Sequence, residues 1–116
     1  MTELTIYHNP KCSKSRAALG LLRQRDVAPH IVEYLKTPPT AAELKAIVRR
    51  LGISAEQLVR KGEAIYKTRY AGKTLPEEQW IEAMVNDPIL IERPIVVRGA
   101  RAVIGRPPES VLQLLT

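Results

Sequence analysis

Hydrophobic and polar residues alternate at the start of the chain and then change to a helical period. Residues 4–7 and 30–35 are rich in β-branched and aromatic side chains, and the first of these stretches alternates apolar with polar positions. Between them, apolar residues recur every three to four positions over residues 13–25, which is typical of an amphipathic helix. The first third of the chain is therefore predicted to form a strand, a helix and a second strand.

The middle of the chain carries helix signals. Residues 40–43 and 54–57 both have the spacing of a capping box, and each precedes apolar residues at helical spacing. Gly52 is placed to end the first of these helices. Residues 61–73 are polar and are predicted to be irregular, whereas residues 74–77 are predicted to cap a further helix. A helical segment of about residues 40–90 is expected.

The last third returns to strands. Residues 95–97 and 102–104 are short and apolar, and the Gly99-Ala100 pair between them suits a type II′ hairpin turn. Residues 109–115 are predicted to form a closing helix. We expect an α/β fold with one mixed, four-stranded sheet flanked by helices. The helical segment would be an insertion between the β-α-β and β-β-α halves of a single domain, residues 1–116.

Composition excludes several classes of protein. The chain of 116 residues has 45% hydrophobic and 26% charged residues, as globular proteins do, and no apolar run long enough to span a membrane. Its beginning has no apolar stretch of the signal-peptide kind, so a cytoplasmic location and no membrane partner are expected. The net charge of +6 permits weak contact with nucleic acid, but aromatic residues make up 4% and no zinc spacing is present. Neither a nucleic-acid partner nor a bound metal is expected.

The sequence contains one cysteine, Cys12, between a turn and the first residues of a predicted helix. The N–H groups at a helix N-terminus stabilise a thiolate, which is the reactive form of cysteine. A lone cysteine is often a small buried hydrophobe, but the polar neighbours of Cys12 favour a chemical role. In the Cys-x-x-Ser spacing, Ser15 cannot resolve a mixed disulfide. Redox turnover would therefore finish on an external thiol.

Two arginines precede prolines, Arg93 before Pro94 and Arg106 before Pro107. A following proline favours an extended conformation, which puts each arginine at a strand boundary. The planar guanidinium matches the shape and charge of a tetrahedral oxyanion. The alternative, a solvated surface arginine, is the usual role for any one of the 18 basic residues.

Five segments of the chain form a recognisable set: HNPKCSKSR at residues 8–16, GIS at 52–54, LVR at 58–60, PILIERPIVV at 88–97 and IGRPP at 104–108. Together they resemble the glutaredoxin-coupled arsenate reductase family, in particular its short bacterial members. The resemblance follows the family order over essentially the whole chain.

The resemblance implies a thioredoxin-like fold with the helical insertion, and it implies a site. Cys12 would be the nucleophile, assisted by His8 and Ser15, which help to stabilise the thiolate. The oxyanion would be bound by Arg60, Arg93 and Arg106, and Pro94 matches the proline that follows a cis peptide bond in this fold.

The resemblance also implies the reaction. Arsenate would be attacked by the Cys12 thiolate, glutathione would be the co-substrate with no bound cofactor, and glutaredoxin would reduce the final mixed disulfide. Two alternatives stay open. The Cys-x-x-Ser spacing also suits a monothiol glutaredoxin-like thiol transferase. A regulator of the Spx type, which binds RNA polymerase without catalysis, is similar in fold but often has Cys-x-x-Cys at this loop.

Overall fold

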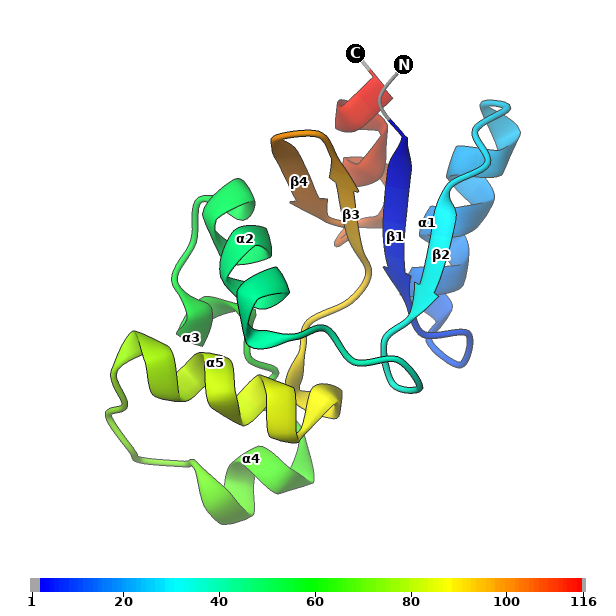
Figure 1. Ribbon diagram of the computed structural model, residues 1–116. Coiled ribbons are helices and arrows are strands. Elements are labelled where there is room, and N and C mark those ends of the chain that lie inside the picture. Colours follow the sequence, from blue (N-terminus) through cyan, green and yellow to red (C-terminus); the bar gives the residue numbers. More distant parts are fainter. Residues whose placement is uncertain (1–2, 116) are drawn as a thin grey trace. The chain divides into compact units, whose positions relative to one another are not determined.

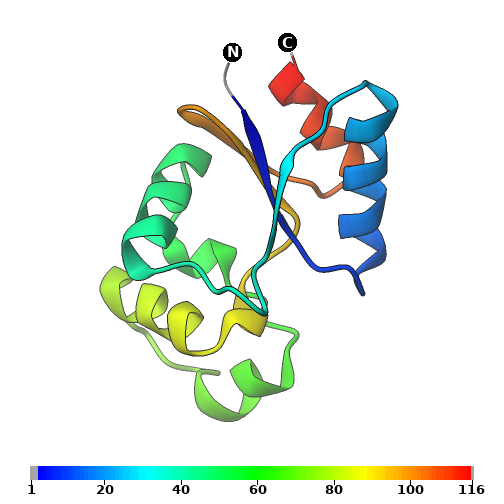
Figure 2. The same ribbon diagram turned by 45° about the vertical axis from the view of Figure 1, so that its right-hand side comes forward.

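The computed structural model describes residues 3–115 and is shown in two views (Figures 1 and 2). The chain divides into two compact units. The first, which holds the sheet, combines residues 1–37 with 93–116, and the second is helical and spans residues 38–92. The helical unit interrupts the sheet unit in the sequence, and the bounds expected for the insertion, about residues 40–90, stay a prediction. That the whole chain is one domain stays a prediction.

The sheet unit contains the four predicted strands, and its sheet is mixed. The strands are β1 (Leu4–His8), β2 (His30–Glu33), β3 (Ile95–Arg98) and β4 (Arg101–Ile104), in the order β2-β1-β3-β4. β1 pairs in parallel with β2, whereas the pairs β1–β3 and β3–β4 are antiparallel. The predicted fold class is confirmed, although β2 ends earlier than residue 35.

One face of this sheet is covered by two helices, α1 (Ser13–Gln24) and the 3₁₀ helix η2 (Pro108–Leu115) (Figure 2). The closing helix is thus present but is 3₁₀ rather than α. Every second residue of β1 is buried, which explains the alternation in its sequence. The core between the sheet and the helices consists of Leu4, Ile6, Ala18, Leu19, Leu22, Val96, Val111 and Leu114.

The turn between β3 and β4 has the predicted geometry. Gly99 has φ +60°, a left-handed value that glycine adopts without strain, and Ala100 does not have a positive φ. This combination fits a type II′ turn, in which only the first central residue is left-handed. The turn fixes the register that pairs Arg98 with Arg101.

The helical unit contains α2 (Ala41–Leu51), α3 (Ala55–Leu58), α4 (Ala64–Arg69), α5 (Glu77–Asn86) and the 3₁₀ helix η1 (Pro88–Leu90). Both predicted capping boxes are present: the Thr40 hydroxyl accepts the N–H of Glu43, and the Ser54 hydroxyl accepts that of Gln57. Gly52 ends α2 with φ +71°. These helix ends are set by local hydrogen bonds, which explains why the sequence predicts them well.

The segment predicted to be irregular contains the short helix α4, so that prediction was wrong. No residue of α4 is buried, and the helix therefore has no apolar period to reveal it. Its position is maintained by aromatic contacts. The ring centroids of Tyr66 and Tyr70 lie 6.3 and 6.1 Å from that of Trp80 on α5.

The predicted cap of α5 was also wrong. Pro76 occupies the N-cap position, and no side chain caps the helix. The Glu77 carboxylate instead accepts the N–H of Ala55, 22 residues earlier, at 2.9 Å. Glu77 thus caps the first turn of α3 and not that of its own helix. No helix within residues 3–115 is long and apolar enough to cross a membrane.

Candidate active site

Cys12 lies where β1 turns into α1. The Asn9 carbonyl accepts the N–H of Cys12 at 3.0 Å, and the Asn9 side-chain oxygen accepts the N–H of Lys11 at 3.0 Å. Cys12 is the N-cap residue of α1, and its own carbonyl accepts the N–H of Arg16. The predicted placement of the cysteine at a helix N-terminus is therefore confirmed. The Cys12 side chain makes no cap hydrogen bond to the first turn of α1.

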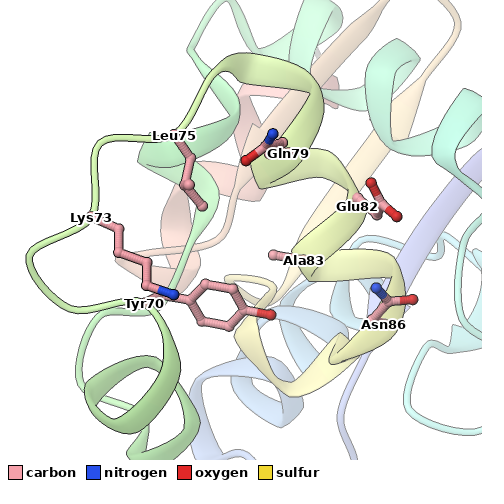
Figure 3. Close-up of a pocket in the computed structure, with 7 residues that line it drawn as sticks. All are labelled: Tyr70, Lys73, Leu75, Gln79, Glu82, Ala83 and Asn86. Carbon is pink, nitrogen blue, oxygen red and sulfur yellow. The ribbon is translucent and has the colours of Figure 1, made fainter.

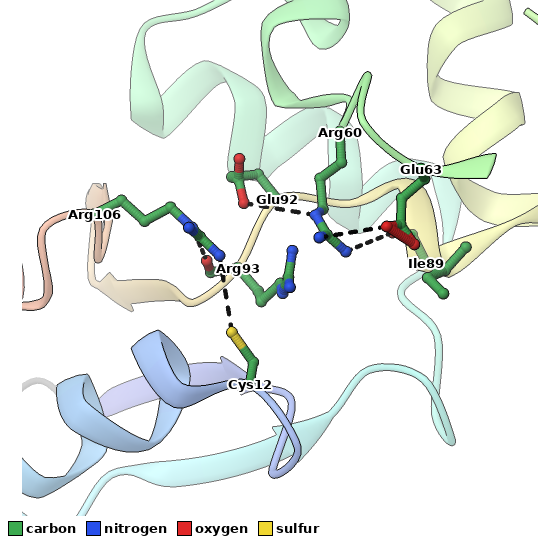
Figure 4. Close-up of polar contacts among 7 residues, drawn as sticks. All are labelled: Cys12, Arg60, Glu63, Ile89, Glu92, Arg93 and Arg106. Atoms are coloured by element: carbon green, nitrogen blue, oxygen red, sulfur yellow. Dashed lines mark hydrogen bonds and ion pairs between the residues drawn. The ribbon is translucent and has the colours of Figure 1, made fainter. Parts of the chain in front are cut away.

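The Cys12 thiol is buried, and a polar group lies next to it. Cys12 is 8% exposed, and Arg106 Nη2 donates to its Sγ at 3.8 Å (Figure 4). Within residues 3–115, this guanidinium is the hydrogen-bond partner of the sulfur. The guanidinium is therefore a charged hydrogen-bond donor to the sulfur. The simpler role of Cys12 as an apolar filler does not explain this contact.

Arg106 is positioned by a second hydrogen bond. Its Nε donates to the carbonyl of Arg93 at 2.8 Å, which orients the plane of the guanidinium. Figure 4 shows the Arg106 guanidinium next to the Cys12 sulfur, with Arg93 beside Arg106. The Arg93-Pro94 peptide bond is cis, as the resemblance implies, and so is Arg106-Pro107. The fold thus brings together the two arginines that were noted for their place before proline.

His8 and Ser15 form a buried pair beside this loop. His8 Nδ1 and Ser15 Oγ are 2.6 Å apart, and Ser15 Oγ also accepts the N–H of Asn9 at 3.0 Å. Burial lowers the pKa of His8, the charges of Arg23 and Arg16 lower it further, and Glu33 opposes them.

The imidazole is therefore held neutral at pH 7. Both hydrogen bonds of Ser15 tie the end of β1 to the first turn of α1. The pair positions the loop that carries Cys12, and its predicted effect on the thiolate stays a prediction.

Arg60 belongs to the helical unit, just after α3. Its N–H donates to the carbonyl of Leu90 at 2.7 Å, next to an isolated bridge between Val59 and Ile91. Its guanidinium contacts Glu63 at 3.4 Å and Glu92 at 4.0 Å. The predicted role of Arg60 beside the thiol stays a prediction.

Sequence reasoning missed these two carboxylates. Glu63 follows Arg60 by three residues, a spacing at which side chains meet on a helical turn, and this could have indicated the pair. Glu92 has no such signal, because it reaches Arg60 from 32 positions away along the chain. Only the return of the chain beside Val59 brings Glu92 to this arginine.

The helical unit also has a cavity of about 290 Å³ (Figure 3). None of the predicted site residues lines it. Its walls are Tyr70, Lys73, Leu75, Gln79, Glu82, Ala83 and Asn86.

The comparisons with known proteins show the family of this chain. The ArsC family model matches residues 7–114, which is nearly all of the chain. The chain belongs to the ArsC family. The uncharacterized protein YfgD of Escherichia coli is 50% identical over 115 residues, which cover 97% of each chain. The arsenate reductase of Neisseria meningitidis is 43% identical over 117 residues, covering 99% of this chain and 100% of the relative.

A solved ArsC structure, the arsenate reductase from Vibrio cholerae, has the same fold. It superposes with a TM-score of 0.93 at 44% identity and covers 97% of each chain. The longer arsenate reductase of Escherichia coli is 40% identical, and the match covers 82% of its length. The resemblance drawn from the sequence motifs is therefore confirmed.

Proposed function

We propose that this chain is an arsenate reductase that takes its electrons from glutathione and glutaredoxin. The observation that supports this most directly is the Arg106 guanidinium on the Cys12 sulfur, at 3.8 Å. This contact places a guanidinium, a group that binds oxyanions, next to a sulfur that can act as a nucleophile. The names of the ArsC relatives from Neisseria meningitidis and Vibrio cholerae support arsenate as the substrate.

In the proposed first step, the Cys12 thiolate attacks arsenic. A sulfur–arsenic bond forms and one arsenic–oxygen bond breaks, with the oxygen leaving as water after protonation. Arg93 and Arg106 neutralise the charge of the oxyanion and orient it for attack. Arg60 is proposed as a third cation on the basis of the resemblance.

In the second step, the glutathione sulfur bonds to the Cys12 sulfur. The sulfur–arsenic bond breaks and leaves its electron pair on arsenic, which is reduced from As(V) to As(III). A thiol of glutaredoxin then reduces the Cys12–glutathione disulfide. The need for external thiols is supported by composition, because the chain has a single cysteine. A cytoplasmic location is proposed as well, since both reductants require a compartment that keeps thiols reduced.

The proposal is tested by coupling NADPH oxidation to arsenate through glutathione reductase, glutathione and glutaredoxin. We expect arsenate-dependent NADPH consumption that Cys12→Ser abolishes. Ser13→Ala, at the exposed neighbouring position, should retain it. Absence of arsenate-dependent turnover at saturating glutaredoxin would overturn the proposal.

A second candidate, a monothiol thiol transferase, is favoured by Ser15 in the place of a second cysteine. This activity would remove glutathione from a model mixed disulfide without arsenate. It should also be insensitive to Arg60→Ala, because no oxyanion is bound. An arsenate-dependent rate that falls in Arg60→Ala while deglutathionylation does not would assign the oxyanion chemistry to the first candidate.

A further inference from the structure

We infer that Glu63 and Glu92 make Arg60 select oxyanions that carry a proton, such as hydrogen arsenate and hydrogen phosphate, over sulfate, which carries none. The inference rests on the proposed function, in which Arg60 binds the oxyanion. Both carboxylates would be specificity-determining residues for that site.

All three nitrogens of the Arg60 guanidinium face an oxygen acceptor. Nη2 is 3.4 Å from a carboxylate oxygen of Glu63, and Nε is 4.0 Å from one of Glu92. Nη1 donates to the carbonyl of Ile89 at 3.5 Å. Figure 4 shows these three groups around the arginine. An oxyanion that bonds to any nitrogen of Arg60 therefore lies beside at least one oxygen of the protein.

These contacts leave the arginine able to bind more. Charge-assisted N–H···O bonds are about 2.7–2.9 Å long, and both ion pairs of Arg60 are clearly longer, at 3.4 and 4.0 Å. A guanidinium has five N–H donors, which is more than these three contacts use. The side chain of Arg60 is also 21% exposed, so that an anion from solvent can reach it.

The oxygens around Arg60 distinguish between anions by their protons. An ionised carboxylate and a carbonyl accept hydrogen bonds and cannot donate them. All oxygens of sulfate are hydrogen-bond acceptors at pH 7. A sulfate oxygen beside Glu63 or Glu92 therefore faces another acceptor, and no hydrogen bond can form between them. Hydrogen arsenate has an As–OH group, and hydrogen phosphate a P–OH group, that can donate to the carboxylate.

Charge acts in the same direction. Arg60 and its two carboxylates together carry a net charge of −1, so this part of the proposed site favours an anion that brings a compensating hydrogen bond over one that does not. The side chains of Glu63 and Glu92 are 23% and 27% exposed, so solvent screens this repulsion only in part. The penalty thus falls most heavily on an unprotonated dianion.

The test compares inorganic phosphate with sulfate. Binding of each anion is measured by calorimetry at pH 7, and each is also used as an inhibitor of arsenate reduction. The intact protein should bind phosphate at least about tenfold more tightly than sulfate. In the double variant Glu63→Gln/Glu92→Gln, this preference should fall by roughly tenfold, because an amide can donate to sulfate.

Glu56→Gln/Glu78→Gln is the matched control, since it also removes two carboxylate charges, from side chains that pair with Lys61 and Lys45 at 2.9 Å each. It should leave the preference for phosphate unchanged. A double variant that is folded by circular dichroism and keeps the full preference would overturn the inference.

Arg60→Ala separates this inference from the proposed function. Arg60→Ala could weaken the binding of both anions while the double variant Glu63→Gln/Glu92→Gln keeps the preference for phosphate. In that case the inference fails and the role of Arg60 as an oxyanion ligand stands. If Arg60→Ala changes the binding of neither anion, Arg60 is not an oxyanion ligand and the inference fails with it. Calorimetry needs no turnover, so the preference is measured even if arsenate reduction is absent and the proposed function has failed.

Discussion

Arg106 and Cys12 are 94 residues apart in the chain, yet a guanidinium nitrogen of Arg106 lies 3.8 Å from the Cys12 sulfur. The second hydrogen bond of Arg106, to the Arg93 carbonyl, fixes this approach from the segment that leads into β3. Cys12 is also the N-cap residue of α1, so a helix N-terminus and a guanidinium both lie at this residue.

Replacing Arg106 with glutamine should slow the reaction of the thiol. Without the cation, the thiolate loses one charge-assisted contact, and we expect alkylation of Cys12 by iodoacetamide at pH 7 to fall roughly three- to tenfold. Arg101→Gln is the control, because Arg101 Nη2 also donates to a backbone carbonyl, that of Gln113, at 2.6 Å. Equal rates in the two variants would contradict the role of Arg106.

Replacing Ser15 with alanine should destabilise the fold. Ser15 is fully buried, and its hydroxyl bonds both His8 Nδ1 and the N–H of Asn9. Its loss leaves two polar groups without this partner, so the free energy of unfolding should fall by about 1–3 kcal/mol. Urea denaturation measures this, with the exposed Ser13→Ala as the control. The prediction fails if the two variants are equally stable.

The stability of the protein should depend on the charge state of His8. Its pKa in the folded state is lowered from the ordinary value of 6.5, above all by burial. The unfolded chain therefore takes up the proton first as the pH falls. The stability associated with the neutral imidazole is present above pH 6.5 and is lost as the pH falls through the folded pKa.

Urea denaturation at pH 7.5 and 5.5 tests this effect. The loss of stability on acidification should be smaller in His8→Gln than in the unchanged protein. His30→Gln, which alters the exposed histidine of β2, should keep the full loss. An NMR titration of His8 with a pKa at or above 6.5 would contradict the prediction.

Two glycines should respond oppositely to alanine. A Cβ at Gly105 would lie 2.7 Å from Pro94 Cγ and 3.1 Å from Val111 Cγ1, which is too close without movement of the core. We expect Gly105→Ala to cost about 1–3 kcal/mol of unfolding free energy. A Cβ at Gly20, inside α1, meets nothing within 4 Å, so Gly20→Ala should be neutral or stabilising by up to about 1 kcal/mol. Thermal denaturation of both variants checks the difference.

Local rules explain which parts of this fold were predictable. The alternation in β1, the capping boxes at Thr40 and Ser54, and the left-handed Gly52 all depend on neighbours within a few residues. Where an element depends on distant partners, prediction failed. The helix α4 is tied to Trp80 through aromatic rings, and its own residues show no apolar period.

The candidate site divides in the same way. The sequence by itself determined that the single cysteine, Cys12, begins a helix and that an external thiol must complete any redox cycle, since both follow from local pattern and composition. Only the tertiary structure decided that Arg106 is the arginine on the sulfur and that Glu63 and Glu92 surround Arg60. The physical reason is that strand pairing and helix packing set which distant side chains meet, and periodicity along the chain does not record those pairings.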